Sequence, residues 1–322
     1  MSGILFLMIS ASDVLSWHAL PGAAALKISE WTVGFDLRMS RISVKEYVLV
    51  DAPDGSEYTL SRLDWELDRV WTGGISLTHR MHRHGYLSFG VWLNLPISSG
   101  TMDDYDWANE TRFDDLLYDG LWTHYSHQKN KLNYLFSLDV NYHFTTGFLF
   151  RFYCGGGLAL RAFKMDAYDG YTQYPENPVT TSPLQVTPTD TEGTGITYSL
   201  VTVAPYASLG FIWHPARSLD LSLFVIGSPV ARVIAVDNHL FREVEFRDTL
   251  DWGLYLFTAL RIGVALSSAV RLQLQLEGLL QPKTKGDATS KDTSTGVTYI
   301  LGQSGAASTS SLSFVLRVEF RI

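Results

Sequence analysis

Acidic side chains crowd one stretch of the sequence, Gly100 to Trp107, which reads Gly-Thr-Met-Asp-Asp-Tyr-Asp-Trp. If Asp104 and Asp106 share one extended segment, the two-residue period points both carboxylates to one face and turns Asp103 to the other. Two carboxylates facing one way repel each other, so one pKa rises and the pair can hold a proton or polarise a water. A solvated acidic loop or an Asx turn is the alternative for this stretch taken alone.

A second group with chemical potential is Asp237-Asn238-His239, which ends an apolar strand-like run. On an extended segment Asp237 and His239 project to one face, where the carboxylate can orient the imidazole and fix its proton-accepting tautomer. Opposite a carboxylate pair, such a dyad could activate a water for attack on a peptide carbonyl. The alternative is a turn with an exposed histidine.

Other chemistries have weaker support. The sequence contains no Gly-x-Ser-x-Gly motif, and its only cysteine, Cys154, is interpreted as a small buried hydrophobe without a catalytic role. His79, His82 and His84 surround a short turn predicted at the opposite end of the molecule, where exposed or structural histidines are expected rather than metal ligands. We therefore predict no metal site and no cofactor.

The composition indicates a membrane sheet rather than a soluble core. Of the 322 residues 46% are hydrophobic and 13% aromatic but only 18% charged, while the mean hydropathy is close to zero at +0.04. This balance suits strands with one face toward lipid and one toward a polar interior. The formal charge of −8 excludes nucleic acid as the main partner and would attract cationic substrates. An apolar run of roughly 18 residues, as a transmembrane helix requires, does not occur.

Alternation of apolar and polar residues recurs in Leu60–His79, nearly strictly in Val270–Gly278, and at the C-terminus from Leu312. A period of two predicts two-faced strands rather than helices. The predicted strands are residues 28–47, 57–79, 84–99, 127–145, 148–166, 195–214, 218–237, 242–266, 269–283 and 310–322. Short turns alternate with long polar segments at residues 48–56, 100–126, 167–194 and 284–309, and the last is interpreted as a solvent loop.

These features predict an all-β fold, a transmembrane antiparallel β-barrel of about ten strands that projects beyond the outer membrane. Residues 1–24 contain an apolar run without a preceding Lys or Arg and are interpreted as an atypical export signal, and residues 25–322 as a single barrel domain. If strands alternate in direction, residues near 46, 102–106, 127 and 237–239 all lie at the long-loop end. The two acid-containing groups are therefore expected to meet there.

The same residues carry a family resemblance. Gly100–Trp107 resembles the Gly-x-Met-x-Asp-x-Asp-Trp segment of the omptin family of outer-membrane proteases, and Ser61–Trp65 resembles its second-strand motif. His127 followed by Leu132-Asn133-Tyr134, Pro205-Tyr206 and Asp237-x-His239 match further blocks of that family. The resemblance covers nearly the whole chain after residue 30.

The resemblance implies an endopeptidase of the outer membrane with its active site on the extracellular side. Asp104 and Asp106 would be the family's aspartate couple, Asp237 and His239 its dyad, with His239 as general base toward a water near Asp104. Glu46 is similar to the glutamate at the floor of the pocket for a basic side chain on the amino side of the scissile bond (P1), and Met102 to a methionine in the pocket wall. His127 would lie near the site without a catalytic role. Polypeptide substrates and a monomeric barrel are implied.

Two departures from the family pattern affect these expectations. The second acidic residue of the P1 pocket, two positions before the dyad aspartate, is Ala235 here, which weakens the expectation of a basic P1 residue. Of the lipopolysaccharide-binding positions only Arg161 resembles the family, whereas Gly157, Ala159, Val201 and Asp251 do not, so dependence on lipopolysaccharide is in doubt. A catalytically inactive surface adhesin or structural barrel is the main alternative, and a porin is third because ten strands leave too narrow an interior.

Overall fold

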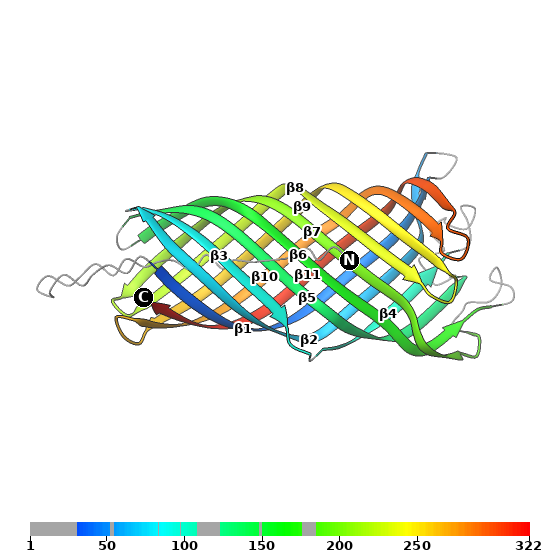
Figure 1. Ribbon diagram of the computed structural model, residues 1–322, viewed down its shortest axis with the longest axis horizontal. Helices are drawn as coiled ribbons and strands as arrows, with labels where there is room; N and C mark the ends of the chain where they lie inside the picture. The colour runs from blue at the N-terminus through cyan, green and yellow to red at the C-terminus, as the bar shows by residue number, and fades with distance from the viewer. Residues whose placement is uncertain are drawn as a thin grey trace, which may run out of the picture.

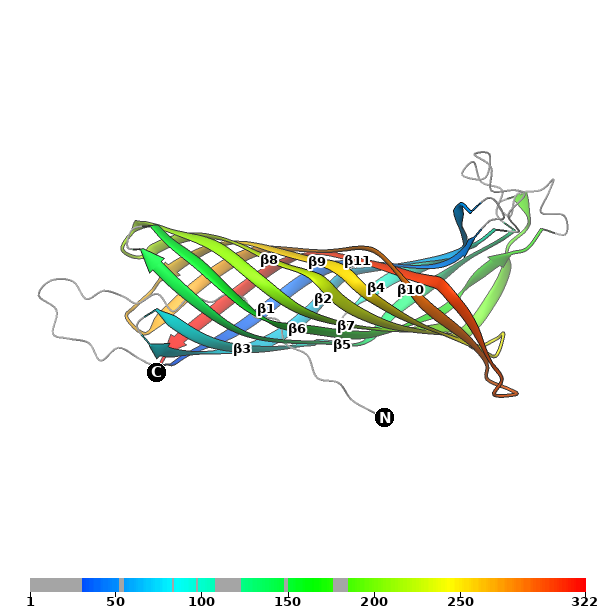
Figure 2. The same ribbon diagram turned by 90° about the horizontal axis from the view of Figure 1, so that it is seen from above.

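The strands close into a barrel in the computed structural model, which describes residues 31–51, 55–82, 84–96, 98–107, 123–147, 150–175 and 185–322. The proposed export signal at residues 1–24 lies outside the described residues. The first strand, β1 (Trp31–Asp51), pairs antiparallel with both β2 (Glu57–His82) and the last strand, β11 (Thr298–Arg321). This closure leaves the sheet without a free edge, as a lipid environment demands. Figures 1 and 2 show a long barrel crossed by steeply tilted strands.

Eleven strand segments occupy ten positions around this barrel. Both β3 (Gly85–Asn94) and β4 (Ser99–Asp106) pair with β2 on one side and with β5 (His124–Gly147) on the other, so they are two halves of one barrel strand. The other strands follow in chain order and each pairs antiparallel with its neighbours: β6 (Phe150–Gln173), β7 (Thr189–Ala216), β8 (Leu219–His239), β9 (Val244–Ala265) and β10 (Val270–Asp292). The predicted all-β antiparallel barrel of about ten strands is confirmed.

The strands extend further than the sequence pattern indicated. The stretch after Gly100, expected to be loop, continues as β4, and the supposed solvent loop at residues 284–309 is mostly the end of β10 and the start of β11. Residues 167–173 and 189–194 likewise belong to β6 and β7. Polar residues on both faces marked these segments as loops, but a barrel wall that stands in water on its outside also tolerates polar residues there.

Apolar side chains form a band on the outside of one half of the barrel. They lie on the strand halves next to the short connections and include Phe35, Ile75, Phe89, Phe152, Leu209, Leu223, Leu260, Leu274 and Phe314. With 26 residues in β2 and 28 in β7, the strands far exceed the roughly 9 to 11 residues that cross a bilayer, so their other halves stand beyond the apolar band. Cys154 is exposed on this surface, so its interpretation as a buried residue was wrong. None of the described residues forms a helix that is long and apolar enough to cross a membrane.

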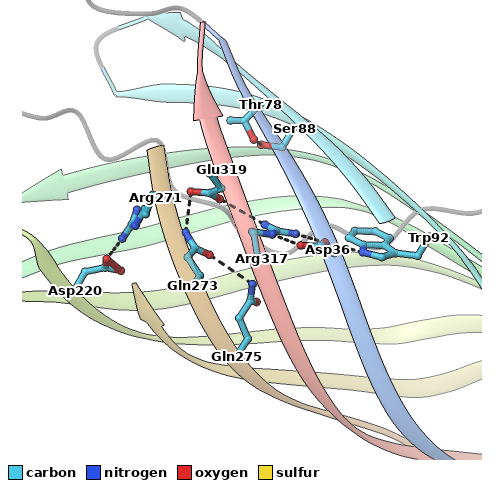
Figure 3. A network of polar contacts seen from close by, with 10 residues as sticks. All are labelled: Asp36, Thr78, Ser88, Trp92, Asp220, Arg271, Gln273, Gln275, Arg317 and Glu319. Atoms are coloured by element: carbon cyan, nitrogen blue, oxygen red, sulfur yellow. Dashed lines mark hydrogen bonds and ion pairs between the residues drawn. The ribbon is translucent and has the colours of Figure 1, made fainter. Parts of the chain in front are cut away.

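The interior of the half with the apolar band holds a network of charged side chains beside a buried apolar cluster that includes Tyr153 and Phe224. The guanidinium of Arg317 on β11 donates two hydrogen bonds of 2.5 Å to the Asp36 carboxylate on β1, which also accepts one of 2.7 Å from the Trp92 indole. Glu319 accepts a bond from Gln273 beside this pair, and Arg271 contacts Asp220 further round (Figure 3). Side chains rather than water therefore occupy this part of the interior.

The Asp36–Arg317 pair is expected to contribute strongly to barrel stability, because both side chains are fully buried. Replacing Asp36 with alanine strands the guanidinium and removes the acceptor of Trp92, which should lower the free energy of unfolding by about 3 to 5 kcal/mol. Thermal unfolding in detergent, followed by the gel mobility of the folded barrel, measures this change. Asp251 pairs with Arg232 at 3.1 Å on the surface, so Asp251→Ala is the matched control and should cost at most about 1 kcal/mol.

A separate apolar cluster fills the other half of the barrel, below its far opening. It contains Trp65 and Leu67 from β2, Met102 from β4, Phe163 and Met165 from β6 and Tyr198 from β7. The opening above it, here called the mouth, is formed by the ends of the strands at residues 51, 57, 106, 124, 239 and 244. The residues expected to do chemistry converge there.

Candidate active site

Asp237 and His239 lie at the mouth end of β8, and alternation turns both side chains inward. His239 Nε2 is 2.5 Å from the Asp237 carboxylate, and both side chains are almost completely buried. Because Nε2 donates to Asp237, Nδ1 is the nitrogen available to accept a proton. Burial by itself lowers the pKa of His239, but the charge and the hydrogen bond of Asp237 outweigh it, so the pKa is raised above its usual value.

The aspartate couple lies on β4, and the structure adds a histidine to it. His124 at the start of β5 donates from Nδ1 to the Asp106 carboxylate at 2.9 Å, and the same nitrogen is 3.9 Å from Asp104. Arg242, just after β8, approaches Asp106 to 3.5 Å. Asp103 faces the outside, where it accepts hydrogen bonds from Tyr125 and from His127.

The two carboxylates of the couple differ in their proton affinity. Asp104 is 3% exposed, and burial together with the neighbouring Asp106 raises its pKa to about 7. Burial also acts on Asp106, but the hydrogen bond and charge of His124 and the charge of Arg242 hold the pKa of Asp106 below its ordinary value. The couple therefore contains one carboxylate that stays ionised and one that can exchange a proton near neutral pH.

A cavity of about 740 Å³ opens beside the dyad. Its lining includes Glu46, Asp106, Asp237, His239 and Arg242. Glu46 on β1 is 4% exposed, and its Oε2 accepts no hydrogen bond from any residue that the structure describes. Burial, followed by the charges of Asp237 and Asp248, raises the pKa of Glu46 well above its usual value.

Asp248 supplies a further buried carboxylate to this region. Its position on β9 is directly opposite Ala235 on β8, and it is 4% exposed. The Asp248 carboxylate packs against Gly305 on β11, where a side chain would come within 2.4 Å of it, so glycine is needed at this position. Burial and the charge of Asp237 raise the pKa of Asp248 to about 7. Glu46, Asp237 and Asp248 are thus three buried acids that affect one another's charge, and the first two line the cavity.

A smaller cavity of about 230 Å³ lies on the other side of the dyad and is lined by Asp104, His124, Gln128, His239 and Arg242, among others. His239 and Arg242 border both cavities. Asp104 borders only the smaller of the two cavities, so the cavities meet beside His239 rather than at Asp104.

Asp104, Asp106 and His124 each offer one metal-ligand atom, all within 4.8 Å of one another. The nearby guanidinium of Arg242 competes with a metal ion for Asp106, since it already approaches that carboxylate to 3.5 Å. This arrangement favours the handling of protons and water over metal binding, and it gives us no reason to assign a cofactor.

The sequence identified part of this assembly and missed part. Asp104, Asp106, Asp237, His239 and Glu46 come together at the mouth. Met102 is fully buried in the apolar cluster and does not line the large cavity. His127 lies on the outer face beside Asp103, and Arg161, the candidate lipopolysaccharide ligand, points into the barrel and lies 7% exposed near Glu277 and Leu279.

His124, Asp248 and Arg242 were not found from the sequence. The strand that carries His124 was predicted to begin at residue 127, so His124 was assigned to a loop. Alternation from Gln128 through Ser126 to His124 was the available signal. The position of Asp248 follows from the pairing of β8 with β9, in which two irregularities change the offset between the strands. Arg242 lies in a turn, which no periodic pattern predicts.

Comparisons with known proteins show what the chain as a whole is similar to. The model of the Omptin family matches residues 28–322. The plasminogen activator of Yersinia pestis is 33% identical over 99 residues, a stretch that covers 29% of this chain and only 28% of that protein. The crystal structure of the outer membrane protease OmpT from Escherichia coli superposes with a TM-score of 0.81 at 15% identity, covering 91% of this chain and 96% of that one.

A closed antiparallel barrel of this length, with an apolar band on one half and acids at the mouth of the other, defines an outer-membrane β-barrel. The chain belongs to the omptin family. The likeness to OmpT shows that the two chains share the barrel fold.

Proposed function

We propose that this protein is an endopeptidase that hydrolyses peptide bonds by an activated water held between Asp104 and the Asp237–His239 dyad. The observation that carries the proposal is that a proton-accepting histidine, held by a buried carboxylate, faces a second carboxylate whose pKa is raised to about 7. An adhesin would have no need for ionisable groups buried in this way, because burial of charge is costly. The mouth of the barrel would face the extracellular medium.

In the proposed reaction, water hydrogen-bonds to His239 Nδ1 and to Asp104. His239 removes a proton as the oxygen attacks the peptide carbonyl, and Asp237 stabilises the resulting imidazolium across 2.5 Å. The imidazolium then gives this proton to the amide nitrogen as the C–N bond breaks, which releases the amine and the carboxylic acid product. Asp106 stays ionised and keeps the pKa of Asp104 high. His124 and Arg242 are positioning residues for Asp106, because both contact its carboxylate.

The proposed preference for a basic P1 side chain rests on the acids of the large cavity. Glu46 and Asp237 line it, and Asp248 lies close enough to raise the pKa of Glu46. A lysine or arginine side chain entering from the mouth would offset the repulsion among these carboxylates. At position 235, where the family pattern has an acid, this chain has alanine. Asp248 on the neighbouring strand β9 would supply the missing negative charge.

Cleavage of a fluorogenic peptide that contains one arginine tests the proposed activity. The refolded barrel should cleave the peptide after that arginine, as mass spectrometry of the products would show, with and without added lipopolysaccharide. A folded barrel that leaves the peptide intact in both conditions would favour the adhesin instead.

Binding of a basic ligand is expected to strengthen as the pH rises from 6 to 8. The pKa of Asp248 is about 7 and that of Glu46 is raised well above its usual value, so the pocket holds protons in its empty state. A bound amidine favours the ionised acids, so binding releases protons and the affinity increases with pH. Calorimetry with an arginine-like amidine in two buffers of different ionisation enthalpy measures the protons released. Asp248→Asn should reduce that number, and equal heats in both buffers for the unmodified protein would contradict the assignment.

A further inference from the structure

The smaller cavity differs in chemistry from the acidic one. Its lining offers the hydroxyls of Ser126, Thr172 and Thr191 and the side-chain amide of Gln128, with Ile196 as an apolar wall. Gln128 is 5% exposed, and its amide oxygen accepts no hydrogen bond within the described ranges of the chain. A buried polar group without a partner is costly, and a ligand that supplies one is favoured in return.

The location of this cavity relates it to the cleavage reaction. It meets the acidic cavity at His239 and Arg242, and Asp104 borders it. Successive side chains of an extended peptide point in opposite directions. A peptide lying across the space between Asp104 and His239 with its P1 side chain in the acidic cavity therefore directs the next side chain, P1′, toward the smaller one.

We propose that the cavity around Gln128 is the subsite for P1′ and that it takes an uncharged side chain bearing an amide or a hydroxyl, such as glutamine or threonine. This inference rests on the proposed peptidase function. It concerns the substrate residue that follows the scissile bond. The Gln128 amide and the surrounding hydroxyls supply both hydrogen-bond donors and acceptors for such a side chain.

The charges around the cavity disfavour a basic P1′ residue. Arg242 lies on its rim, where its guanidinium is held by Tyr174 at 3.1 Å and by Asp106 at 3.5 Å. Asp104 is the one carboxylate among the described lining residues, and it is needed to hold the attacking water. A lysine at P1′ would therefore meet a fixed positive charge and would compete for the carboxylate that the reaction uses.

Gly195 on β7 gives a way to alter this cavity without touching the catalytic residues. A side chain at this position would lie 3.1 Å from the Phe241 ring and 3.2 Å from the Gln128 amide oxygen, so it would fill the space beside Gln128. Gly195 does not have a positive φ, so valine can adopt its extended backbone. Gly195→Val is thus expected to block the cavity and leave the barrel folded.

The test uses quenched peptides that share an arginine at P1 and differ only in P1′, which is alanine, leucine, glutamine or lysine. With the unmodified protein, kcat/KM for glutamine should exceed that for leucine or lysine by about tenfold, the effect of pairing one buried polar group. Gly195→Val should lower the value for glutamine to that for alanine and leave alanine unchanged. Gln128→Leu should reverse the order of glutamine and leucine.

The outcomes separate this inference from the function on which it rests. If lysine at P1′ is cleaved as well as glutamine, or if Gly195→Val slows all four peptides equally while the barrel stays folded, the P1′ assignment is overturned and the peptidase function stands. If none of the peptides is cleaved, the proposed function itself fails and takes the subsite with it. Gel mobility of the unheated protein reports whether each variant has folded.

Discussion

Replacing His239 with alanine is expected to lower kcat/KM for a basic peptide by about a thousandfold, within the range that a general base contributes. His239 Nδ1 is the proposed proton acceptor, and without it the water is held by Asp104 alone. Asp104→Asn should cause a loss of similar size, because it removes the carboxylate that holds the water. The double variant should be little worse than either single one, since residues that act as a unit are not additive.

A neighbouring acid provides the matched control for this experiment. Asp103 is adjacent to Asp104 in β4 but faces the outside, where it contacts Tyr125 and His127. Asp103→Asn therefore changes the same residue type in the same strand and should retain full activity. Equal activity in the Asp103, Asp104 and His239 variants would mean that the water-activating site lies elsewhere.

The second large effect concerns selectivity rather than rate. Asp248→Asn should lower the ratio of kcat/KM between an arginine and a glutamine substrate at P1 by about a hundredfold, the scale of a lost partner for a buried charge. The glutamine substrate should be cleaved at nearly its original rate, because Asp248 does not contact the water. Steady-state kinetics with the two peptides gives the ratio directly.

The position opposite Asp248 allows a rescue experiment. Ala235 faces Asp248 across the β8–β9 pairing and is fully buried. In the Asp248→Asn background, Ala235→Asp returns a carboxylate to the same region from the other strand, so it should restore the preference for arginine. An unchanged ratio in Asp248→Asn alone would show that Glu46 and Asp237 are sufficient for recognition.

Period-two alternation determined most of what could be predicted about the barrel. Leu272, Leu274 and Leu276 alternate with Arg271, Gln273 and Gln275, which is enough to predict a strand with one apolar and one polar face. The same argument turned Asp104 inward and Asp103 outward, as the structure has them. It failed where the outer face is also polar, so β4 and the ends of β10 and β11 were taken for loops.

Several residues of the site could not be predicted, because they reach it through contacts between strands that the sequence pattern does not show. Asp237 and His239 are two residues apart, so their mutual hydrogen bond follows from strand geometry alone. His124 meets Asp106 because β4 pairs with β5 at one particular offset, and Asp248 meets Glu46 and Asp237 because three strands converge at the mouth. Contacts between residues of different strands depend on the strand offset and on the closure of the barrel, and a single sequence defines neither.

The polar network inside the apolar band lies in a different half of the barrel from the apolar cluster beneath the mouth, and this separation has a consequence for how such a protein can diversify. The Asp36–Arg317 pair supports the membrane half without contacting the cavities. Substitutions around Glu46, Ala235 and Asp248 can therefore exchange one recognition surface for another while insertion and folding proceed unchanged. Proteins with the same membrane-embedded half can therefore differ in their substrate preference.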